Sequence, residues 1–319
     1  MALLEVDALE VFLGPPGRET RVLRGLSFVL EAGQTLGIVG ESGCGKSMTA
    51  LALMGLLPSP SRAAGRVRFM NNDLLRMGEQ ERRGLRGRHM AMVFQEPMTA
   101  LNPVITVGWQ IAEMLFIHRG LPREAARAAA VELLERVGIA EPQRRARAYP
   151  HELSGGMRQR VMIAMAMACR PELLIADEPT TALDVSVQAQ ILDLMLELQR
   201  DHGTGLLFIS HNFGVISEMA DRVQVMYAGK VVEEGLTASV LSAPQHPYTA
   251  GLLQTLPDLG RRVPVLPVIS GQVPDLARLG PGCSFYPRCT RRAANCLAAE
   301  PPWQASTADA EGRVACCHV

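Results

Sequence analysis

The chain has 319 residues, of which 48% are hydrophobic and 20% are charged, enough to bury a large core. Its 32 basic and 32 acidic residues balance, and only 4% of its residues are aromatic. Nucleic-acid binders usually carry a basic excess or stacking aromatic side chains, so we expect no nucleic-acid partner. No apolar run approaches the roughly 18 residues that span a bilayer, and the acidic start "MALLEVDALE" predicts no signal peptide.

The first third of the chain has the pattern of strands around a glycine-rich loop. Residues 4–13 and 26–33 alternate between apolar and polar side chains, which predicts two β-strands, the second with Leu26, Phe28 and Leu30 on one face. The apolar run "TLGIVG" at 35–40 predicts a buried strand that enters the loop, and 46–57 is helical in pattern. Residues 66–70 alternate again.

The rest of the chain is mixed. From 104 to about 170 the pattern is mostly helical, with one helix that begins at Pro122 and stops near Gly138. The apolar runs at 173–179 and 205–212 predict buried strands that flank a helix at 185–201, and 222–235 predicts a hairpin turning at Ala228, Gly229 and Lys230. After about residue 256 the texture becomes rich in Pro, Gly, Arg and Cys, which we interpret as a separate small appendage.

The loop "GESGCGKS" at 40–47 fits the pattern G-x-x-x-x-G-K-[ST], with a strand before it and a helix after it. Backbone N–H groups of such a loop form a nest for phosphates, and Lys46 adds a positive charge for the outer phosphates. The hydroxyl of Ser47 is a ligand for Mg²⁺. These features predict a nucleotide triphosphate site.

A phosphate loop needs a further metal ligand and a group that activates water. The strand "LLIADEP" at 173–179 ends in Asp177, which can bind Mg²⁺ through water, followed by Glu178. A carboxylate at a strand end can take a proton from attacking water. From the residues alone, an equal alternative is that Glu178 caps the next turn.

A second anion site is indicated by "YPHELSGGMRQR" at 149–160. Ser154 can cap the helix that follows, and Gly155 and Gly156 let a ligand approach the backbone at the positive helix end. The sequence therefore carries two phosphate cradles.

Across residues 4–250 the order of these motifs resembles the ATPase subunits of ATP-binding-cassette (ABC) transporters. The resemblance implies an α/β fold: an ABC-type P-loop ATPase with a RecA-like core, an antiparallel β-subdomain and a helical subdomain at about 96–165. The cassette would occupy residues 1–255. The Cys-rich appendage at 256–319 would follow it.

The resemblance also explains the two cradles. In this family two ATPase subunits face each other head to tail, and the "LSGG" of one closes on ATP held by the loop of the other. Ser154, Gly155 and Gly156 would therefore contact the partner's ATP, and Asp184 would lie at the dimer interface. Met157 departs from the glutamine that is commoner in the wider family, which affects the identity of one contact.

The resemblance implies further site residues one by one. Glu178, His211 and Gln95 would be catalytic, and Ser47, Gln95 and Asp177 would hold Mg²⁺. Phe12 would stack on adenine, although a Phe at a strand end is more often core. The ATP loop would comprise Gly40, Glu41, Ser42, Gly43, Cys44, Gly45, Lys46, Ser47 and Met48.

Four stretches resemble one subgroup, the ATPases of dipeptide and oligopeptide importers, in which Met157 is ordinary. They are 94–103, 153–166, 176–192 and 246–253. This resemblance implies a peripheral protein on the cytoplasmic face of the inner membrane, with a second homologous ATPase, two membrane permease subunits and an extracytoplasmic peptide-binding protein as partners. The peptide never touches such a chain, so the sequence cannot name it.

Five of the seven cysteines lie in the last 37 residues, in a polar segment with little apolar pattern. Their spacings fit neither paired C-x₂-C zinc sites nor ferredoxin runs, so the residues alone leave the metal open. The resemblance implies a [4Fe–4S] cluster on Cys283, Cys289, Cys296 and Cys316, with Cys317 spare. Zinc or unmetallated thiols are the alternatives.

Three classes of function are compatible with these motifs. The leading hypothesis is an ATPase that energises peptide import, with a nickel or other small-solute importer of the same group as its near alternative. A soluble cassette ATPase acting on DNA or ribosomes usually has two cassettes or a long coiled-coil insert, and neither is present in the sequence. A redox or iron sensor is the third, and it predicts that cluster loss alters the ATPase rate.

Overall fold

The computed structural model describes residues 2–181, 183–255 and 268–318, which form two compact units. The first unit contains residues 2–3, 30–34 and 76–207, and the second contains the remaining described residues. The domain boundary expected at 255/256 adjoins residues 256–267, which lie outside the described residues, so that boundary stays a prediction.

The first unit contains a small parallel sheet with helices. Strand β6 (Met90–Val93) pairs in parallel with β7 (Leu173–Asp177), and every residue of both strands is buried. Strand β8 (Gly205–Ser210) starts in this unit and continues into the second. Continuous apolar strands of this kind are typical of parallel sheets covered on both faces. The sequence predicts β7 and β8 as buried strands but not β6.

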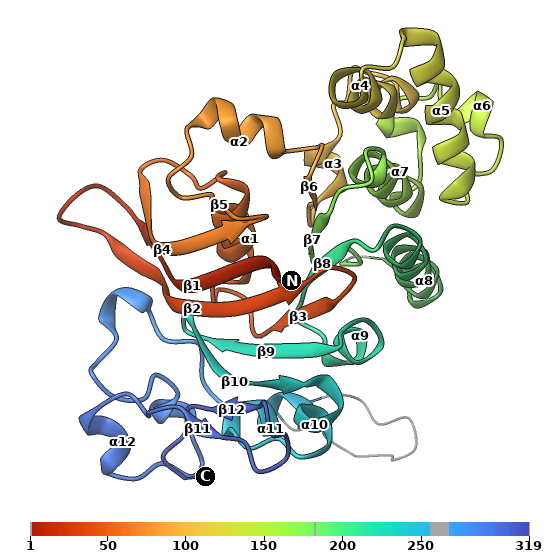
Figure 1. Cartoon of the computed structure of the whole chain (residues 1–319). Helices are drawn as coiled ribbons and strands as arrows, with labels where there is room; N and C mark the ends of the chain where they lie inside the picture. The colour runs from red at the N-terminus through yellow and green to blue at the C-terminus, as the bar shows by residue number, and fades with distance from the viewer. Residues whose placement is uncertain (1, 182, 256–267, 319) are drawn as a thin grey trace. The chain divides into compact units, whose positions relative to one another are not determined.

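The helices of the first unit fill the region expected to be helical (Figure 1). Helices α4 (Val107–Arg119) and α5 (Arg123–Arg136) pack on each other and on α7 (Gly155–Met167). Helix α5 follows Pro122 and is succeeded by Gly138 at φ 74°, which confirms the predicted start and stop. The helical elements are α2 (Glu79–Leu85), α3 (Pro97–Ala100), α4 (Val107–Arg119), α5 (Arg123–Arg136), α6 (Pro142–Arg145), η1 (Pro150–Glu152), α7 (Gly155–Met167) and α8 (Val185–His202).

The second unit contains a four-stranded sheet in the order β2-β1-β4-β5. Its strands are β1 (Ala2–Leu13), β2 (Thr20–Glu31), β4 (Ser61–Phe69) and β5 (Asn72–Asp73). Strand β1 runs antiparallel to β4, with Leu4 opposite Phe69. Leu26, Phe28 and Leu30 of β2 are all buried, which confirms the apolar face predicted from their alternation.

The same unit carries the strands that lead into and lie beside the glycine loop. Strand β3 (Thr35–Val39) pairs in parallel with β9 (Arg222–Tyr227), which forms an antiparallel hairpin with β10 (Lys230–Leu236). Ala228 and Gly229 of the connecting turn have φ of 46° and 81°, as a tight hairpin turn requires. The predicted hairpin is confirmed.

The helical elements of the second unit are short. They are α1 (Lys46–Met54), α9 (Phe213–Met219), α10 (Thr237–Ser242), α11 (Pro247–Gln254), η2 (Leu276–Arg278), η3 (Tyr286–Arg288) and α12 (Asn295–Ala298). Throughout the part of the chain that the structure describes, no helix is both long enough and apolar enough to cross a bilayer.

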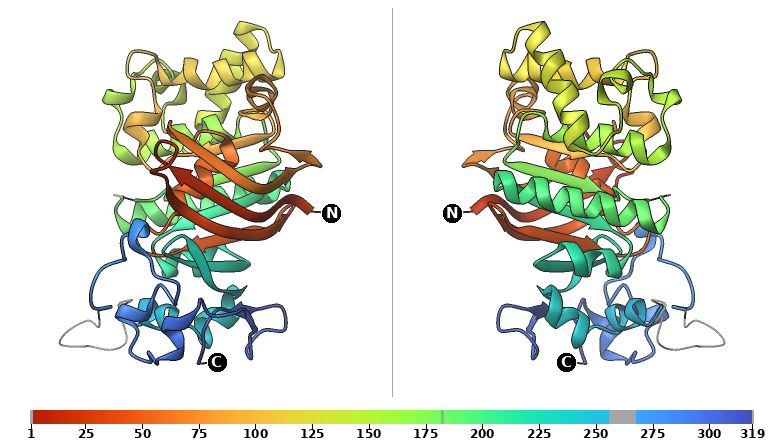
Figure 2. Two further views of the ribbon diagram at one scale, coloured as in Figure 1. Left: turned by 90° about the vertical axis from the view of Figure 1, so that its left-hand side faces the viewer. Right: turned by 90° about the vertical axis from the view of Figure 1, so that its right-hand side faces the viewer.

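The C-terminal segment, residues 268–318, belongs to the second unit and adds strands to the β9–β10 hairpin. Strand β12 (Arg313–Val314) lies between β10 and β11 (Gln304–Ala305) and pairs antiparallel with both. In both views of Figure 2 the blue C-terminal elements lie beside the segment that contains β10 and α11. The expected separate appendage is therefore not confirmed. Strands of two residues are too short to produce a periodic pattern, which is why the sequence did not reveal them.

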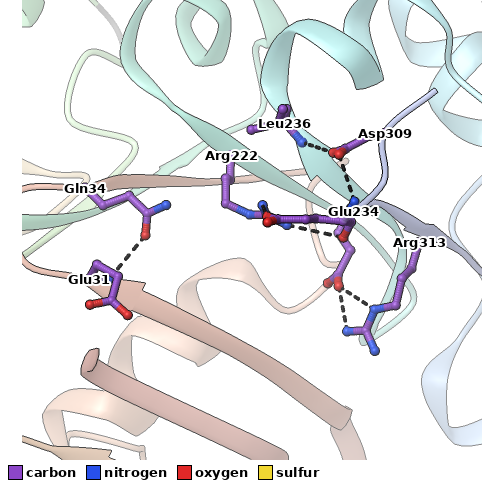
Figure 3. Close-up of polar contacts among 8 residues, drawn as sticks. Glu31, Gln34, Arg222, Glu234, Leu236, Asp309 and Arg313 are labelled. Carbon is purple, nitrogen blue, oxygen red and sulfur yellow. Dashed lines mark hydrogen bonds and ion pairs between the residues drawn. The ribbon is translucent and has the colours of Figure 1, made fainter. Parts of the chain in front are cut away.

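Charged groups reinforce this pairing (Figure 3). The guanidinium of Arg313 donates to the Glu234 carboxylate on β10 at 2.6 and 2.8 Å. Asp309 accepts a hydrogen bond of 2.6 Å from the Leu236 backbone N–H, and Arg222 donates to Glu311 at 2.6 Å. The segment is thus anchored to both strands of the hairpin.

Candidate nucleotide-binding site

The glycine loop connects β3 to α1, as its sequence predicts. Gly43 and Gly45 have φ of 81° and 107°, a region that side chains with a Cβ rarely adopt. A Cβ on Gly40 would lie 2.3 Å from the carbonyl oxygen of Met226 and 2.8 Å from the sulfur of Cys44. The first glycine therefore lets the loop pack directly against the end of β9.

Lys46 is the buried cation of this loop. Its side chain is only 5% exposed, and its Nζ donates to the carbonyl oxygens of Gly40 at 2.7 Å and Glu41 at 3.2 Å. These carbonyl oxygens accept hydrogen bonds from the ammonium group, as phosphate oxygens would. Cys44 points into the core, and burial raises the pKa of its thiol, so this residue offers a phosphate its backbone only.

Phe12, the predicted adenine platform, lies on β1 opposite Arg62 of β4. The Arg62 guanidinium carbon stands 3.6 Å from the centre of the ring, a cation–π contact, and Arg62 also pairs with Glu19 at 2.7 Å. Adenine would have to use the other ring face or replace Arg62. Stacking on Phe12 therefore stays a prediction.

The carboxylates at the end of β7 belong to the first unit. Asp177 is 5% exposed, and Glu178 follows it with φ 47°, a left-handed conformation rare for a residue with a side chain. Oε2 of Glu178 accepts hydrogen bonds from Thr181 Oγ1 at 3.0 Å and Gln95 Nε2 at 3.4 Å. Two residues expected at the attacking water, Glu178 and Gln95, are thus adjacent. Such backbone strain costs about 1–3 kcal/mol and clusters at functional sites.

The "LSGG" stretch begins helix α7 as predicted. Ser154 is the N-cap, and its Oγ accepts a hydrogen bond of 3.3 Å from the Met157 N–H. A Cβ on Gly156 would come within 2.8 Å of Val187 on α8, whereas one on Gly155 would meet Leu183 at an ordinary 4.0 Å. Packing within the chain thus requires glycine at 156 but not at 155.

Asp184, the residue predicted at a dimer interface, caps helix α8. Its carboxylate accepts from the Val187 N–H at 2.9 Å and the Ser186 hydroxyl at 2.8 Å. These hydrogen bonds hold the pKa of Asp184 below its usual range. The caps Ser154 and Asp184 therefore begin two helices that touch where Gly156 meets Val187.

His211 belongs to the second unit, directly after β8. Its side chain is exposed, while the next residue, Asn212, caps α9 by accepting from the Gly214 N–H at 2.8 Å. The local fold thus presents the histidine at the end of a buried strand, as the sequence predicts.

Comparison with known proteins identifies the family. A protein-family model described as ABC transporter matches residues 23–181. A second, described as oligopeptide/dipeptide transporter, C-terminal region, matches residues 232–296. The dipeptide transport ATP-binding protein DppD of Escherichia coli is 48% identical over 319 residues, covering 100% of this chain and 97% of the relative. The chain belongs to the ATP-binding proteins of the ABC transporter family.

Two further similarities agree with this assignment. The oligopeptide transport ATP-binding protein OppD of Salmonella typhimurium is 47% identical over 315 residues, covering 99% of this chain and 93% of OppD. A solved dimeric structure of the ATP-binding cassette MJ0796 with ADP and Pi has a TM-score of 0.66 and 26% identity, and covers 73% of this chain and 98% of that one. The chain is therefore an ABC-type ATPase with the cassette fold, and the resemblance drawn from its motifs is confirmed.

The C-terminal cysteines of this ABC ATPase gather in one place. One small cavity is lined by Cys283, Cys289, Cys296 and Cys316, together with Cys317 and two histidines, His246 and His318. Burial raises the pKa of the Cys283 and Cys316 thiols, which are therefore neutral in the free chain. Within residues 2–181, 183–255 and 268–318, no three His, Cys, Asp or Glu side chains are arranged to hold a metal ion.

Proposed function

We propose that this ABC ATPase hydrolyses ATP to drive the import of dipeptides or oligopeptides through a membrane transporter. The observation that carries the proposal is the similarity over nearly the whole chain to proteins named for dipeptide and oligopeptide transport, including the C-terminal region at 232–296. The near alternative, a nickel or other small-solute importer, has no comparable support among these names.

The proposed chemistry assigns one task to each element of the site. The loop at 40–48 binds the phosphates, and Lys46 exchanges the carbonyls of Gly40 and Glu41 for phosphate oxygens. Ser47, Gln95 and Asp177 would hold Mg²⁺, which would supply positive charge that offsets the charge of the phosphates. The loop itself contributes backbone N–H groups.

Hydrolysis needs a base beside the attacking water. We assign this role to Glu178, whose carboxylate already accepts a hydrogen bond from Gln95. His211 orients the water. Because Glu178 also accepts from Thr181, its carboxylate is fixed before a substrate arrives, which reduces the reorganisation that the reaction requires.

The signature residues are proposed to serve a partner's nucleotide. Gly155 is not required for packing within this chain, and the Ser154 cap places it at the positive end of α7. In this proposal a second homologous ATPase faces the chain head to tail, with Asp184 at the interface. The proposed transporter also contains two permease subunits and acts with an extracytoplasmic peptide-binding protein. The chain would lie on the cytoplasmic face of the inner membrane.

Purification of the tagged full chain from membranes in mild detergent tests this proposal. We expect recovery of two polytopic subunits and a second ATPase, with ATPase activity that rises on addition of peptide-loaded binding protein. Activity that responds to Ni²⁺ and not to peptide would favour the near alternative. Recovery of ribosomes or DNA in place of membrane subunits would contradict transport altogether.

We also propose that Cys283, Cys289, Cys296 and Cys316 hold a [4Fe–4S] cluster with a structural role. The support is chemical: four thiols line one cavity, and each iron of such a cube takes one thiolate.

The cluster proposal predicts brown protein after anaerobic purification, with about four iron and four sulfide per chain. The Cys289→Ser variant is expected to lose the visible absorption and to expose the C-terminal segment to protease, because that segment has little apolar core of its own. Cys317→Ser is the matched control and is expected to keep both properties. Stoichiometric zinc without acid-labile sulfide in anaerobic material would contradict the cluster.

A further inference from the structure

The second residue of the phosphate loop is held by the C-terminal segment. Nη1 and Nη2 of Arg288 donate to the two carboxylate oxygens of Glu41 at 2.6 and 2.9 Å. The Arg288 side chain is only 3% exposed, and that of Glu41 is 29% exposed. This is the two-pronged arginine–carboxylate pairing that fixes both groups in direction as well as in distance.

Arg288 is held in place from other sides. Its Nε donates to the carbonyl oxygen of Ser270 at 3.0 Å, and its Nη2 also reaches that of Ile269 at 3.2 Å. The guanidinium carbon lies 5.8 Å from the centre of the Tyr227 ring. The hydrogen bonds to Glu41 raise the pKa of Arg288 above its already high value, so the guanidinium stays charged at every physiological pH.

Glu41 is in turn connected to the phosphate-binding groups through its backbone. Its carbonyl oxygen accepts from Lys46 Nζ at 3.2 Å and from the Cys44 N–H at 3.3 Å. Its own N–H donates to the hydroxyl of Tyr248 on α11 at 2.9 Å. The residue that Arg288 holds is thus one of the two whose carbonyl oxygens accept from the lysine of the loop.

We propose that Arg288 is a positioning residue of the ATP site, which holds the glycine loop in shape and neutralises Glu41. The inference deepens the proposed function, because it rests on ATP binding at residues 40–48. It makes the C-terminal segment a structural part of the nucleotide site.

The charge of Glu41 sets the sign of the effect. Without Arg288, the carboxylate would be left unpaired in the loop that receives the triphosphate, and like charges at such distances repel. The loop would also lose its fixed shape. Both changes weaken ATP binding, whereas neutralising Glu41 removes the repulsion.

The test is the ATP dissociation constant of the full chain, measured by titration calorimetry. Arg288→Ala is expected to weaken ATP binding at least about tenfold, because it leaves the Glu41 carboxylate of a largely buried charge pair without its partner. Arg278→Ala is the matched control, since it removes an arginine of the same segment that is 86% exposed, and it is expected to change nothing. Adding Glu41→Gln to Arg288→Ala should recover most of the affinity.

Two further readouts separate positioning from loss of folding. In the membrane complex, Arg288→Ala should raise KM for ATP and leave kcat within about twofold, because the pair does not touch the reacting atoms. Arg288→Lys keeps the charge without the fork and should fall between wild type and Arg288→Ala. If limited proteolysis shows that Arg288→Ala unfolds the segment, the ATP dissociation constant of Arg288→Lys is measured instead, with and without Glu41→Gln. A loss of affinity that Glu41→Gln relieves supports the inference, and unchanged affinity contradicts it.

Two results would overturn the inference: an ATP affinity of Arg288→Ala equal to that of Arg278→Ala, or a loss that Glu41→Gln does not relieve. Neither result bears on peptide import, because binding is measured on the chain alone. Conversely, failure to recover membrane subunits would leave the Arg288–Glu41 pairing untouched.

Discussion

Replacing Glu178 by glutamine is expected to leave ATP binding intact and to lower the hydrolysis rate by about 10²–10⁴-fold. The change keeps the size of the side chain and an oxygen that can accept from Thr181, but it removes the base. ATP remains bound and unhydrolysed, so the paired ATPases should accumulate in the closed state. The measurement is the single-turnover rate of the purified complex at saturating ATP, alongside the ATP dissociation constant.

Glu172→Gln is the matched control for this experiment. Glu172 directly precedes β7, whereas Glu178 directly follows it. The Glu172 carboxylate pairs with His89 at 3.1 Å. The Glu172→Gln complex is expected to retain activity. A Glu178→Gln complex that hydrolyses ATP within a few-fold of wild type would show that another group activates the water.

Replacing Ser154 by arginine is expected to abolish ATPase activity of the assembled complex while sparing the nucleotide affinity of the isolated chain. The long cation would occupy the end of α7, where the partner's γ-phosphate must approach, and the loss of aligned donors there should cost about 10²-fold or more. The loop at 40–48 is unchanged, so the chain's own ATP is unaffected. Calorimetry on the chain and steady-state ATPase assays on the complex give the two values.

The outcome for the isolated chain decides which nucleotide Ser154 serves. A large loss of ATP affinity there would place Ser154 at the chain's own nucleotide and contradict the head-to-tail pairing. If the Ser154→Arg complex retains ATPase activity, Ser154 contacts neither the chain's own ATP nor the partner's.

Local features of the fold were predictable because they depend on neighbouring residues. The alternation of β2, the Ser154 cap and the turn at Ala228 and Gly229 each follow from a short stretch of sequence. The glycine pattern of the loop likewise carries its own backbone requirement, visible at Gly43 and Gly45.

Features that join distant residues were not predictable from the sequence pattern. Arg288 and Glu41 are 247 positions apart, and neither lies in a periodic segment that would reveal the pairing. The contact of Arg62 with Phe12 depends on the register of two strands, and β12 is too short to produce a pattern. The left-handed backbone of Glu178 is likewise set by its surroundings, because local preference opposes it.

The most direct test of the account is peptide uptake by liposomes that contain the whole transporter, with ATP enclosed and binding protein outside. We expect a labelled dipeptide to accumulate only when ATP is inside, and accumulation to cease when the chain carries Glu178→Gln. Excess unlabelled dipeptide should compete, and Ni²⁺ should not. Uptake that persists with Glu178→Gln, or transport of Ni²⁺ without transport of peptide, would contradict ATP-driven peptide import by this chain.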